Sequence, residues 1–139
     1  MNDVVVQKIQ SIQRCIERAR QEYGSDPERF PTNYTAQDAA VLNVLRACEQ
    51  TIDLANHVIQ TSKMGVPASS AESFDLLRAK SVIDAALAEK LKRMVHFRNL
   101  VVHQYQDMNL AVIQQVITTG LDDLLLFGDC VLRFVRAAG

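Results

Sequence analysis

The sequence predicts an all-α fold, a bundle of four long helices and one short helix in near-antiparallel packing. Three observations lead to this class. Apolar residues recur at spacings of three and four along most of the chain, which is the period of one helix face. No segment alternates with a period of two over a useful length. Glycine (5) and proline (3) are scarce in 139 residues, whereas an all-β fold needs many turns.

The first helix is expected over residues 3–23. Its apolar stripe comprises Val5, Ile9, Ile12, Ile16, Ala19 and Tyr23. Asn2 and Asp3 are candidate N-caps, and Gly24 is a candidate for the C′ position just after the helix. Residues 25–34 carry two prolines and show no helical period, so they are expected to form a loop.

A second helix is expected from Thr35 to about Ser62. Thr35 and Asp38 resemble a capping box at its start. The apolar stripe comprises Val41, Leu45, Cys48, Ile52, Ala55 and Ile59. Gly65 and Pro67 follow it, and this pair is typical of a helix stop.

A short third helix follows and ends near Val82. Ser69 and Glu72 have the spacing of a capping box at its start, and Phe74 and Leu77 are expected to face inward. The sequence therefore predicts a small helix that packs on the long ones by two large apolar side chains.

The last two helices are separated by a break at residues 107–109. Asp84 and Asn109 are their candidate N-caps. The apolar positions are Leu87, Leu91, Met94 and Val95 in the fourth helix, and Ile113, Ile117, Leu121, Leu124, Val131 and Val135 in the fifth. Gly128 lies on the fifth stripe and predicts a close approach of another helix, while Gly120 predicts some bending.

Length and composition fit a single domain over residues 1–139. Hydrophobic residues make up 48%, charged residues make up 22%, and the formal net charge is −1. These values exclude a disordered chain and a surface that is basic overall.

Cys15, Cys48 and Cys130 lack the spacing of a zinc site, so we expect free thiols in a reducing cytoplasm. We expect no signal peptide, because Asp3 and a three-residue apolar run open the chain. We expect no membrane span, because no run of 18 apolar residues occurs.

Positive charge is concentrated in residues 78–106, which carry six Lys or Arg against two Asp or Glu. Three of these basic side chains form a candidate RNA-binding face on the fourth helix: Lys90, Lys92 and Arg93. The alternative is an ordinary solvated helix face with lysines.

Arg98 lies on the same helical stripe as Leu91 and Met94, so its side chain is expected to point inward and to need an anionic partner. His103 follows five residues later, and on an unbroken helix the two side chains would diverge by about 140°. For the two side chains to act together, the arginine must reach round the helix, the helix end must distort near residues 101–102, or a second chain must supply the partner.

The strip FRNLVVHQY from Phe97 to Tyr105 resembles the RX4HXY signature of the HepT-like toxin branch of the HEPN superfamily. Similar segments occur elsewhere: Gln37-Asp38-Ala39, Ile52 to His57, Gly65-x-Pro67, and Ser70-x-x-Ser73-Phe74. The resemblance covers about residues 4–135. The sequence departs from it at His96, where Gly is frequent, and at Gln104, where Glu is common.

The resemblance implies an HEPN-type bundle that is the toxin of a type VII-like toxin–antitoxin pair. It implies a metal-independent endoribonuclease that needs no cofactor and acts as a homodimer, with Arg98 and His103 of both chains at the cleft. RNA supplies its own 2′-OH nucleophile, histidine serves as acid or base, and arginine stabilises the phosphorane. Asn99 would support this site. The expected products are a 2′,3′-cyclic phosphate and a 5′-OH end. The resemblance also implies that a nucleotidyltransferase antitoxin transfers AMP to Tyr105.

Several alternatives stay open in the sequence. Asp53 either pairs with Arg98, orients His103, or is a surface acid. His57 and His96 are more readily explained as a structural and a surface histidine. Tyr105 is otherwise a core aromatic residue with a hydrated hydroxyl. The alternative function is a non-catalytic HEPN module that binds a nucleotidyltransferase or RNA. A purely structural bundle is disfavoured by the inward arginine.

Overall fold

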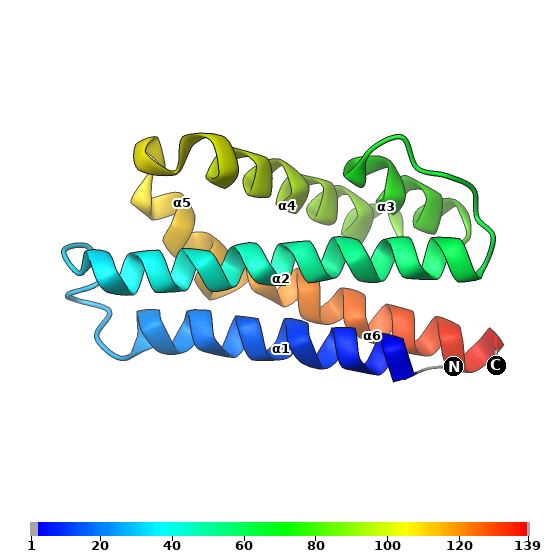
Figure 1. Cartoon of the computed structure of the whole chain (residues 1–139), viewed down its shortest axis with the longest axis horizontal. Helices are drawn as coiled ribbons and strands as arrows, with labels where there is room; N and C mark the ends of the chain where they lie inside the picture. Colours follow the sequence, from blue (N-terminus) through cyan, green and yellow to red (C-terminus); the bar gives the residue numbers. More distant parts are fainter. Residues whose placement is uncertain (1–2, 139) are drawn as a thin grey trace.

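The computed structural model describes residues 3–138 and confirms the all-α bundle (Figure 1). Its helices are α1 (Asp3–Gly24), α2 (Tyr34–Thr61), α3 (Ser70–Ala79), α4 (Ala85–Gln104), α5 (Leu110–Gln115) and α6 (Leu121–Ala138). A 3-10 turn, Tyr105–Asp107, follows α4, and a π-helical turn, Val116–Gly120, joins α5 to α6.

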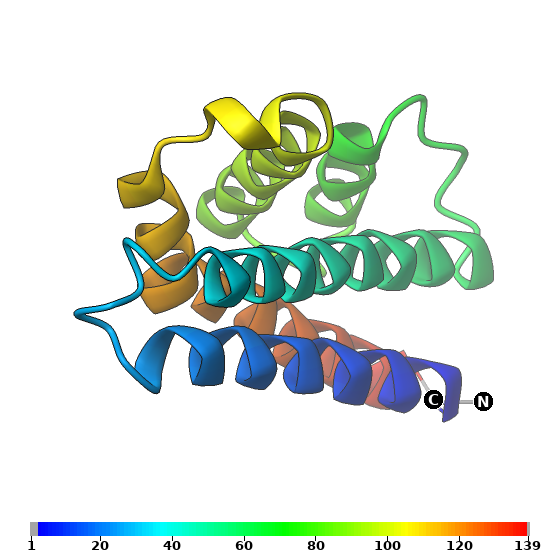
Figure 2. The ribbon, with the colours of Figure 1, turned by 60° about the vertical axis from the view of Figure 1, so that its left-hand side comes forward.

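The long helix α2 is the centre of the bundle. α1 lies beside it in the opposite direction, α6 packs against both, and α3 and α4 cover the other side of α2 (Figures 1 and 2). Because it has neighbours on several sides, α2 buries more than the single stripe predicted; the additional buried residues are Ala36, Ala40, Asn43, Val44, Ala47, Thr51, Leu54 and Val58. Leu45, predicted to be in the core, is only partly buried. α4 slants away from α2 toward its C-terminal end in Figure 1.

Three of the predicted caps are confirmed. Ser69 Oγ accepts from the Glu72 amide at 3.1 Å, Asp84 Oδ1 from the Leu87 amide at 2.8 Å, and Asn109 Oδ1 from the Ala111 amide at 2.8 Å. Such local side-chain acceptors satisfy the first free amides of a helix, so their spacing is readable from sequence.

The predicted capping box of Thr35 and Asp38 is wrong. The cap is Asn33, whose Oδ1 accepts from the Ala36 amide at 3.0 Å, so the helix begins at Tyr34. Asp38 is therefore not engaged at the helix start.

The predicted ends of the first helix also differ. Asp3 is the first residue of α1, and Gly24 is its last helical residue instead of the C′ residue beyond it. Asn2, the other candidate cap, lies outside the described residues.

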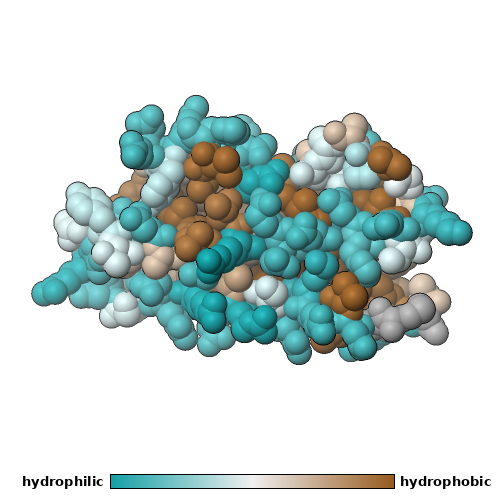
Figure 3. Space-filling view, viewed as in Figure 1, coloured by the Kyte–Doolittle hydropathy of each residue, from teal (hydrophilic) through white to brown (hydrophobic). Residues whose placement is uncertain are grey.

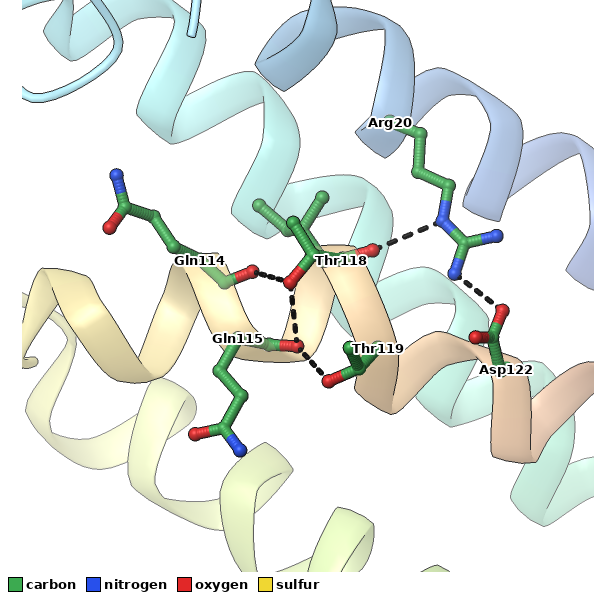
Figure 4. A network of polar contacts seen from close by, with 7 residues as sticks. Arg20, Gln114, Gln115, Thr118, Thr119 and Asp122 are labelled. Carbon is green, nitrogen blue, oxygen red and sulfur yellow. Dashed lines mark hydrogen bonds and ion pairs between the residues drawn. The ribbon is translucent and has the colours of Figure 1, made fainter. Parts of the chain in front are cut away.

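The bend predicted near Gly120 corresponds to the π-helical turn. α5 and α6 run in different directions on its two sides (Figure 2). Thr118 Oγ1 and Thr119 Oγ1 donate to the carbonyls four residues earlier, at 2.8 and 2.9 Å (Figure 4). Arg20 of α1 donates to the Ile117 carbonyl at 3.0 Å and to Asp122 Oδ1 at 2.8 Å. These bonds satisfy backbone groups that the widened turn releases from the regular helical ladder.

The segment Leu110–Ala138 is, by length and composition alone, long and apolar enough to cross a membrane. A core helix passes the same test, and this segment supplies core side chains: Ile113, Ile117, Leu121, Leu124, Phe127 and Val131 are buried. A Cβ built on Gly128 would lie 3.5 Å from the side chain of Ile9 on α1. The predicted close approach of a helix at this glycine is therefore confirmed.

Candidate active site

Arg98 points from α4 toward α2, as predicted, and its side chain is only 19% exposed. Nη1 donates to Glu49 Oε1 at 2.5 Å, Nε to Asn99 Oδ1 at 2.8 Å, and Nη2 to Ser70 Oγ at 3.4 Å. The expected anionic partner is thus present, and it is Glu49 of α2. Three partners on three helices fix the guanidinium between α2, α3 and α4.

A cleft of about 360 Å³ opens beside this arginine. Leu45 and Glu49 of α2 and Arg98, Asn99 and Val102 of α4 line it. Val102 is 58% exposed, and Leu42, one helical turn from Leu45, is 46% exposed. Figure 3 shows apolar side chains gathered between the C-terminal half of α4 and the N-terminal half of α2. The charged pair therefore lies beside an exposed apolar surface, which we call the α2–α4 face (Leu42, Leu45 and Val102).

His103 is exposed near the end of α4, and within residues 3–138 its side chain makes no hydrogen bond. Residues 101–102 lie within α4, so the distortion that would turn His103 toward Arg98 is absent there. The backbone leaves helical geometry only at Gln104, where φ is −142° and ψ is 32°. The guanidinium of Arg98 is held by Glu49, Asn99 and Ser70, and no hydrogen bond within residues 3–138 joins it to His103. Within one chain, the structure does not bring these two side chains together.

Of the three alternatives left open for Asp53, an ion pair with Arg98 is not formed within the described residues. Asp53 is exposed, and Glu49, one turn earlier on the same face of α2, takes its place. Both acids flank the apolar stripe, so the sequence favours neither. The position along α2 at which α4 packs against it decides which of the two acids meets Arg98. This position depends on tertiary packing. A contribution of Asp53 to the site stays a prediction.

Asn99 lies beside Arg98 and contacts its guanidinium directly. Its Oδ1 orients Arg98, while the amide nitrogen makes no hydrogen bond within the described chain. Ser70, which begins α3, is a further partner of Arg98 and was not among the predicted site residues. The resemblance placed Ser70 in a shared segment, and that was the available signal.

Tyr105 lies just beyond the last residue of α4 and does not continue that helix. It begins the 3-10 turn, and its hydroxyl donates to Asp38 Oδ1, 67 residues earlier on α2. Partial burial, followed by the bond to Asp38, raises the pKa of Tyr105 to about 12. The phenol is therefore a neutral donor at physiological pH, and the turn holds its oxygen against a carboxylate.

The three basic residues predicted to bind RNA do not form one unpaired surface. Lys92 Nζ lies 3.1 Å from Asp75 and 3.4 Å from Glu89, and Lys90 Nζ lies 3.9 Å from Asp123. Lys90 and Arg93 border a groove of about 460 Å³ between α4 and α6, apart from the Arg98 cleft. RNA binding by these residues stays a prediction.

The remaining candidates have no partner in the site. His96 is exposed and His57 is partly buried on α2. Cys15, Cys48 and Cys130 are free thiols, as predicted. Burial, assisted by the negative charge of Glu49, raises the pKa of Cys48 to about 12. Across residues 3–138 there is no group of three or more His, Cys, Asp or Glu side chains arranged to hold a metal ion.

Comparison with known proteins finds a matching family profile and proteins of similar sequence and structure. A family profile described as "Ribonuclease HepT-like" matches residues 12–131. An mRNA nuclease HepT of Shewanella oneidensis is 42% identical over 131 residues, which cover 94% of this chain and 98% of that protein. A chain of a toxin–antitoxin crystal structure with AMP-PNP has a TM-score of 0.89 and 40% identity, with 95% and 99% of the two chains covered. A tri-AMPylated HEPN toxin of Shewanella oneidensis, in complex with an MNT antitoxin, has a TM-score of 0.89 and 41% identity, with 96% and 99% covered.

Proposed function

This chain belongs to the HepT-like ribonuclease family, and from that premise we propose that it is the toxin of a cytoplasmic toxin–antitoxin pair. It cleaves RNA, and a nucleotidyltransferase antitoxin neutralises it by transferring AMP to Tyr105. The observation that carries the proposal is an arginine held at an open cleft by Glu49, Asn99 and Ser70, within the signature strip Phe97–Tyr105. The tri-AMPylated state and the MNT partner of the Shewanella oneidensis toxin support the mode of control.

The proposed reaction uses only side chains and the substrate. The 2′-OH of RNA attacks the adjacent phosphorus, the bond to the 5′ oxygen breaks, and a 2′,3′-cyclic phosphate and a 5′-OH end result. One His103 takes the 2′ proton and another gives a proton to the leaving oxygen. Arg98 stabilises the charge on the equatorial oxygens with its fork of donors, and the Asn99 amide nitrogen adds a further donor. No step in this sequence needs a metal ion.

We further propose that the active unit is a homodimer. Arg98 and His103 diverge on one regular helix, so a composite site requires the histidine of a second chain. The α2–α4 face borders the cleft and presents Leu42 and Val102 to solvent. A two-fold axis through this face would set the two signature strips opposite each other. The apolar stripe of α5 and α6 is largely buried within the chain, so it is less suited to a contact with a second copy.

Val102→Asp is expected to convert the dimer to a monomer and to lower RNA cleavage at least 100-fold. A carboxylate on each side of an apolar two-fold interface would be desolvated close to its own copy, which is strongly unfavourable. Light scattering and an RNA-cleavage assay measure the two effects. Val66→Asp, at an exposed valine in the loop before α3, is the matched control and should change neither. A parent protein that is monomeric at micromolar concentration and still active would contradict the composite site.

Glu49 is expected to compete with the substrate phosphate for Arg98. Glu49→Gln removes this competing charge, so RNA should bind about 3- to 10-fold more tightly, with a steeper salt dependence. Binding is measured by fluorescence anisotropy in a His103→Ala background, which prevents cleavage during the titration. Glu17→Gln, on the exposed side of α1, makes the same charge change away from the cleft. Equal affinities for Glu49→Gln and Glu17→Gln would show that Glu49 does not gate the arginine.

The alternative function, a non-catalytic module that binds a nucleotidyltransferase or RNA, is favoured by one observation. In the isolated chain the arginine is already neutralised by Glu49. An RNA-cleavage assay with the purified protein separates the two functions. Cleavage that depends on Arg98 supports the ribonuclease, and RNA or antitoxin binding without cleavage supports the module.

A further inference from the structure

The hydroxyl of Tyr105 and the carboxylate of Asp38 form a contact that helix formation does not explain. Asn33 caps α2, so Asp38 has no capping role. Within residues 3–138 the carboxylate of Asp38 makes no ion pair and no hydrogen bond other than the one from Tyr105. This exposed acid lies on the second turn of α2 and meets the 3-10 turn across 67 residues of sequence. Within the described residues, the one polar partner of this carboxylate is thus the oxygen that the proposed modification would join to AMP.

The chemistry of AMP transfer needs a proton acceptor at this position. A phenol is largely protonated at neutral pH and is a weak nucleophile until its proton leaves. Burial and the bond to Asp38 make Tyr105 more difficult to ionise than an ordinary tyrosine. The proton must therefore move while the oxygen attacks, and its acceptor must already be within hydrogen-bond reach.

We propose that Asp38 is the general base of this AMP transfer, a residue of the toxin that assists its own inactivation. The inference rests on the proposed function. The Tyr105 oxygen attacks the α-phosphorus of ATP, an oxygen–phosphorus bond forms, and the bond between the α-phosphorus and the bridging oxygen breaks. Pyrophosphate leaves, and the phenolic proton passes to the carboxylate of Asp38. The nucleotidyltransferase would supply the bound ATP, while the toxin would supply both the nucleophile and the base.

The same contact cannot persist after transfer. The phenolic oxygen then carries no proton to donate, and the new phosphodiester is negative like the carboxylate of Asp38. Repulsion between these two groups would move the modified side chain away from the start of α2. The modified side chain of Tyr105 would therefore move away from the carboxylate of Asp38 and be free to contact other parts of the surface.

The test measures the rate of AMP transfer by the nucleotidyltransferase antitoxin of the proposed pair, with ATP, by intact-mass spectrometry. Asp38→Asn keeps an oxygen that accepts the hydrogen bond but cannot take the proton. Its kcat is expected to fall about 100-fold, with the KM for the toxin within threefold of the parent. Asp38→Glu, which restores a base, should recover much of the rate. Asp107→Asn removes an acid two residues from Tyr105 that does not contact the hydroxyl, and it should transfer within threefold of the parent.

Three outcomes would overturn the inference. Transfer to Asp38→Asn at the parent's rate would exclude a base at this position. A raised KM with an unchanged kcat would assign Asp38 to docking instead of proton transfer. An equal loss in Asp107→Asn would show an effect of local charge alone. If the parent protein receives no AMP, the proposed control at Tyr105 is contradicted. If the parent is modified and Asp38→Asn is modified at the same rate, only the role of Asp38 is contradicted. Thermal unfolding followed by circular dichroism verifies that each variant is folded.

Discussion

Replacing His103 by alanine is expected to lower RNA cleavage about 10²- to 10⁴-fold, because the site loses the group that moves protons to and from the reacting oxygens. Arg98→Ala is expected to lower it about 10²- to 10³-fold through loss of donors to the phosphorane. Arg98→Lys should recover only part of this loss, since an ammonium keeps the charge without the fork of donors. Single-turnover cleavage of a labelled RNA measures each rate, and relief of growth inhibition reports the same losses in cells.

Matched variants separate chemistry from folding. His96→Ala removes an exposed histidine of the same helix, and Arg78→Ala removes an exposed arginine of α3. Both should cleave RNA at nearly the parent's rate. His103 is exposed and Arg98 adds little apolar core, so both alanine variants should keep the helical circular dichroism spectrum. Cleavage within threefold of the parent by His103→Ala or by Arg98→Ala would contradict the assigned roles.

Tyr105→Phe is expected to abolish AMP transfer altogether, because no hydroxyl remains to form the bond to phosphorus. The AMP group on the parent adds a phosphodiester charge and a nucleoside close to the end of α4, which would exclude the RNA phosphate. Co-expression with the antitoxin followed by intact-mass spectrometry should show AMP-sized increases for the parent and none for Tyr105→Phe. The variant should therefore remain toxic in the presence of the antitoxin.

Tyr34→Phe is the control for this variant, because it removes the hydroxyl of an exposed tyrosine at the start of α2. It should be modified at Tyr105 and neutralised like the parent. Normal neutralisation of Tyr105→Phe without any mass increase would mean that the antitoxin acts by occlusion.

The bundle could be predicted from the sequence because its determinants are local. The period of the apolar residues sets each helix, and Ser69, Asp84 and Asn109 cap helices through amides two or three residues away. The start of α2 was misplaced because Thr35 and Asn33 both suit an N-cap, and only the structure shows which one accepts the amide. The inward direction of Arg98 was also predictable, since it shares a stripe with Leu91.

The partners of the site residues were not predictable, because they depend on how helices meet. Glu49 and Asp53 lie on one face of α2. The position along α2 at which α4 packs against it places Glu49, and not Asp53, beside Arg98. The pair of Asp38 and Tyr105 joins residues 67 positions apart, across a 3-10 turn that replaces the expected continuation of α4. Helical periodicity gives directions around an axis, and it carries no information about such crossings.

The most direct test of a ribonuclease that uses Arg98 and His103 without a metal is analysis of RNA ends in EDTA. The purified protein is incubated with a labelled RNA and excess chelator, and the products are treated with a phosphatase that removes 3′ phosphates only after the cyclic phosphate is opened by acid. We expect undiminished cleavage in EDTA, products with 2′,3′-cyclic phosphate and 5′-OH ends, and cleavage by the Arg98→Ala and His103→Ala variants that is lowered at least about 100-fold. Cleavage that stops in EDTA, or products with 3′-OH and 5′-phosphate ends, would contradict it.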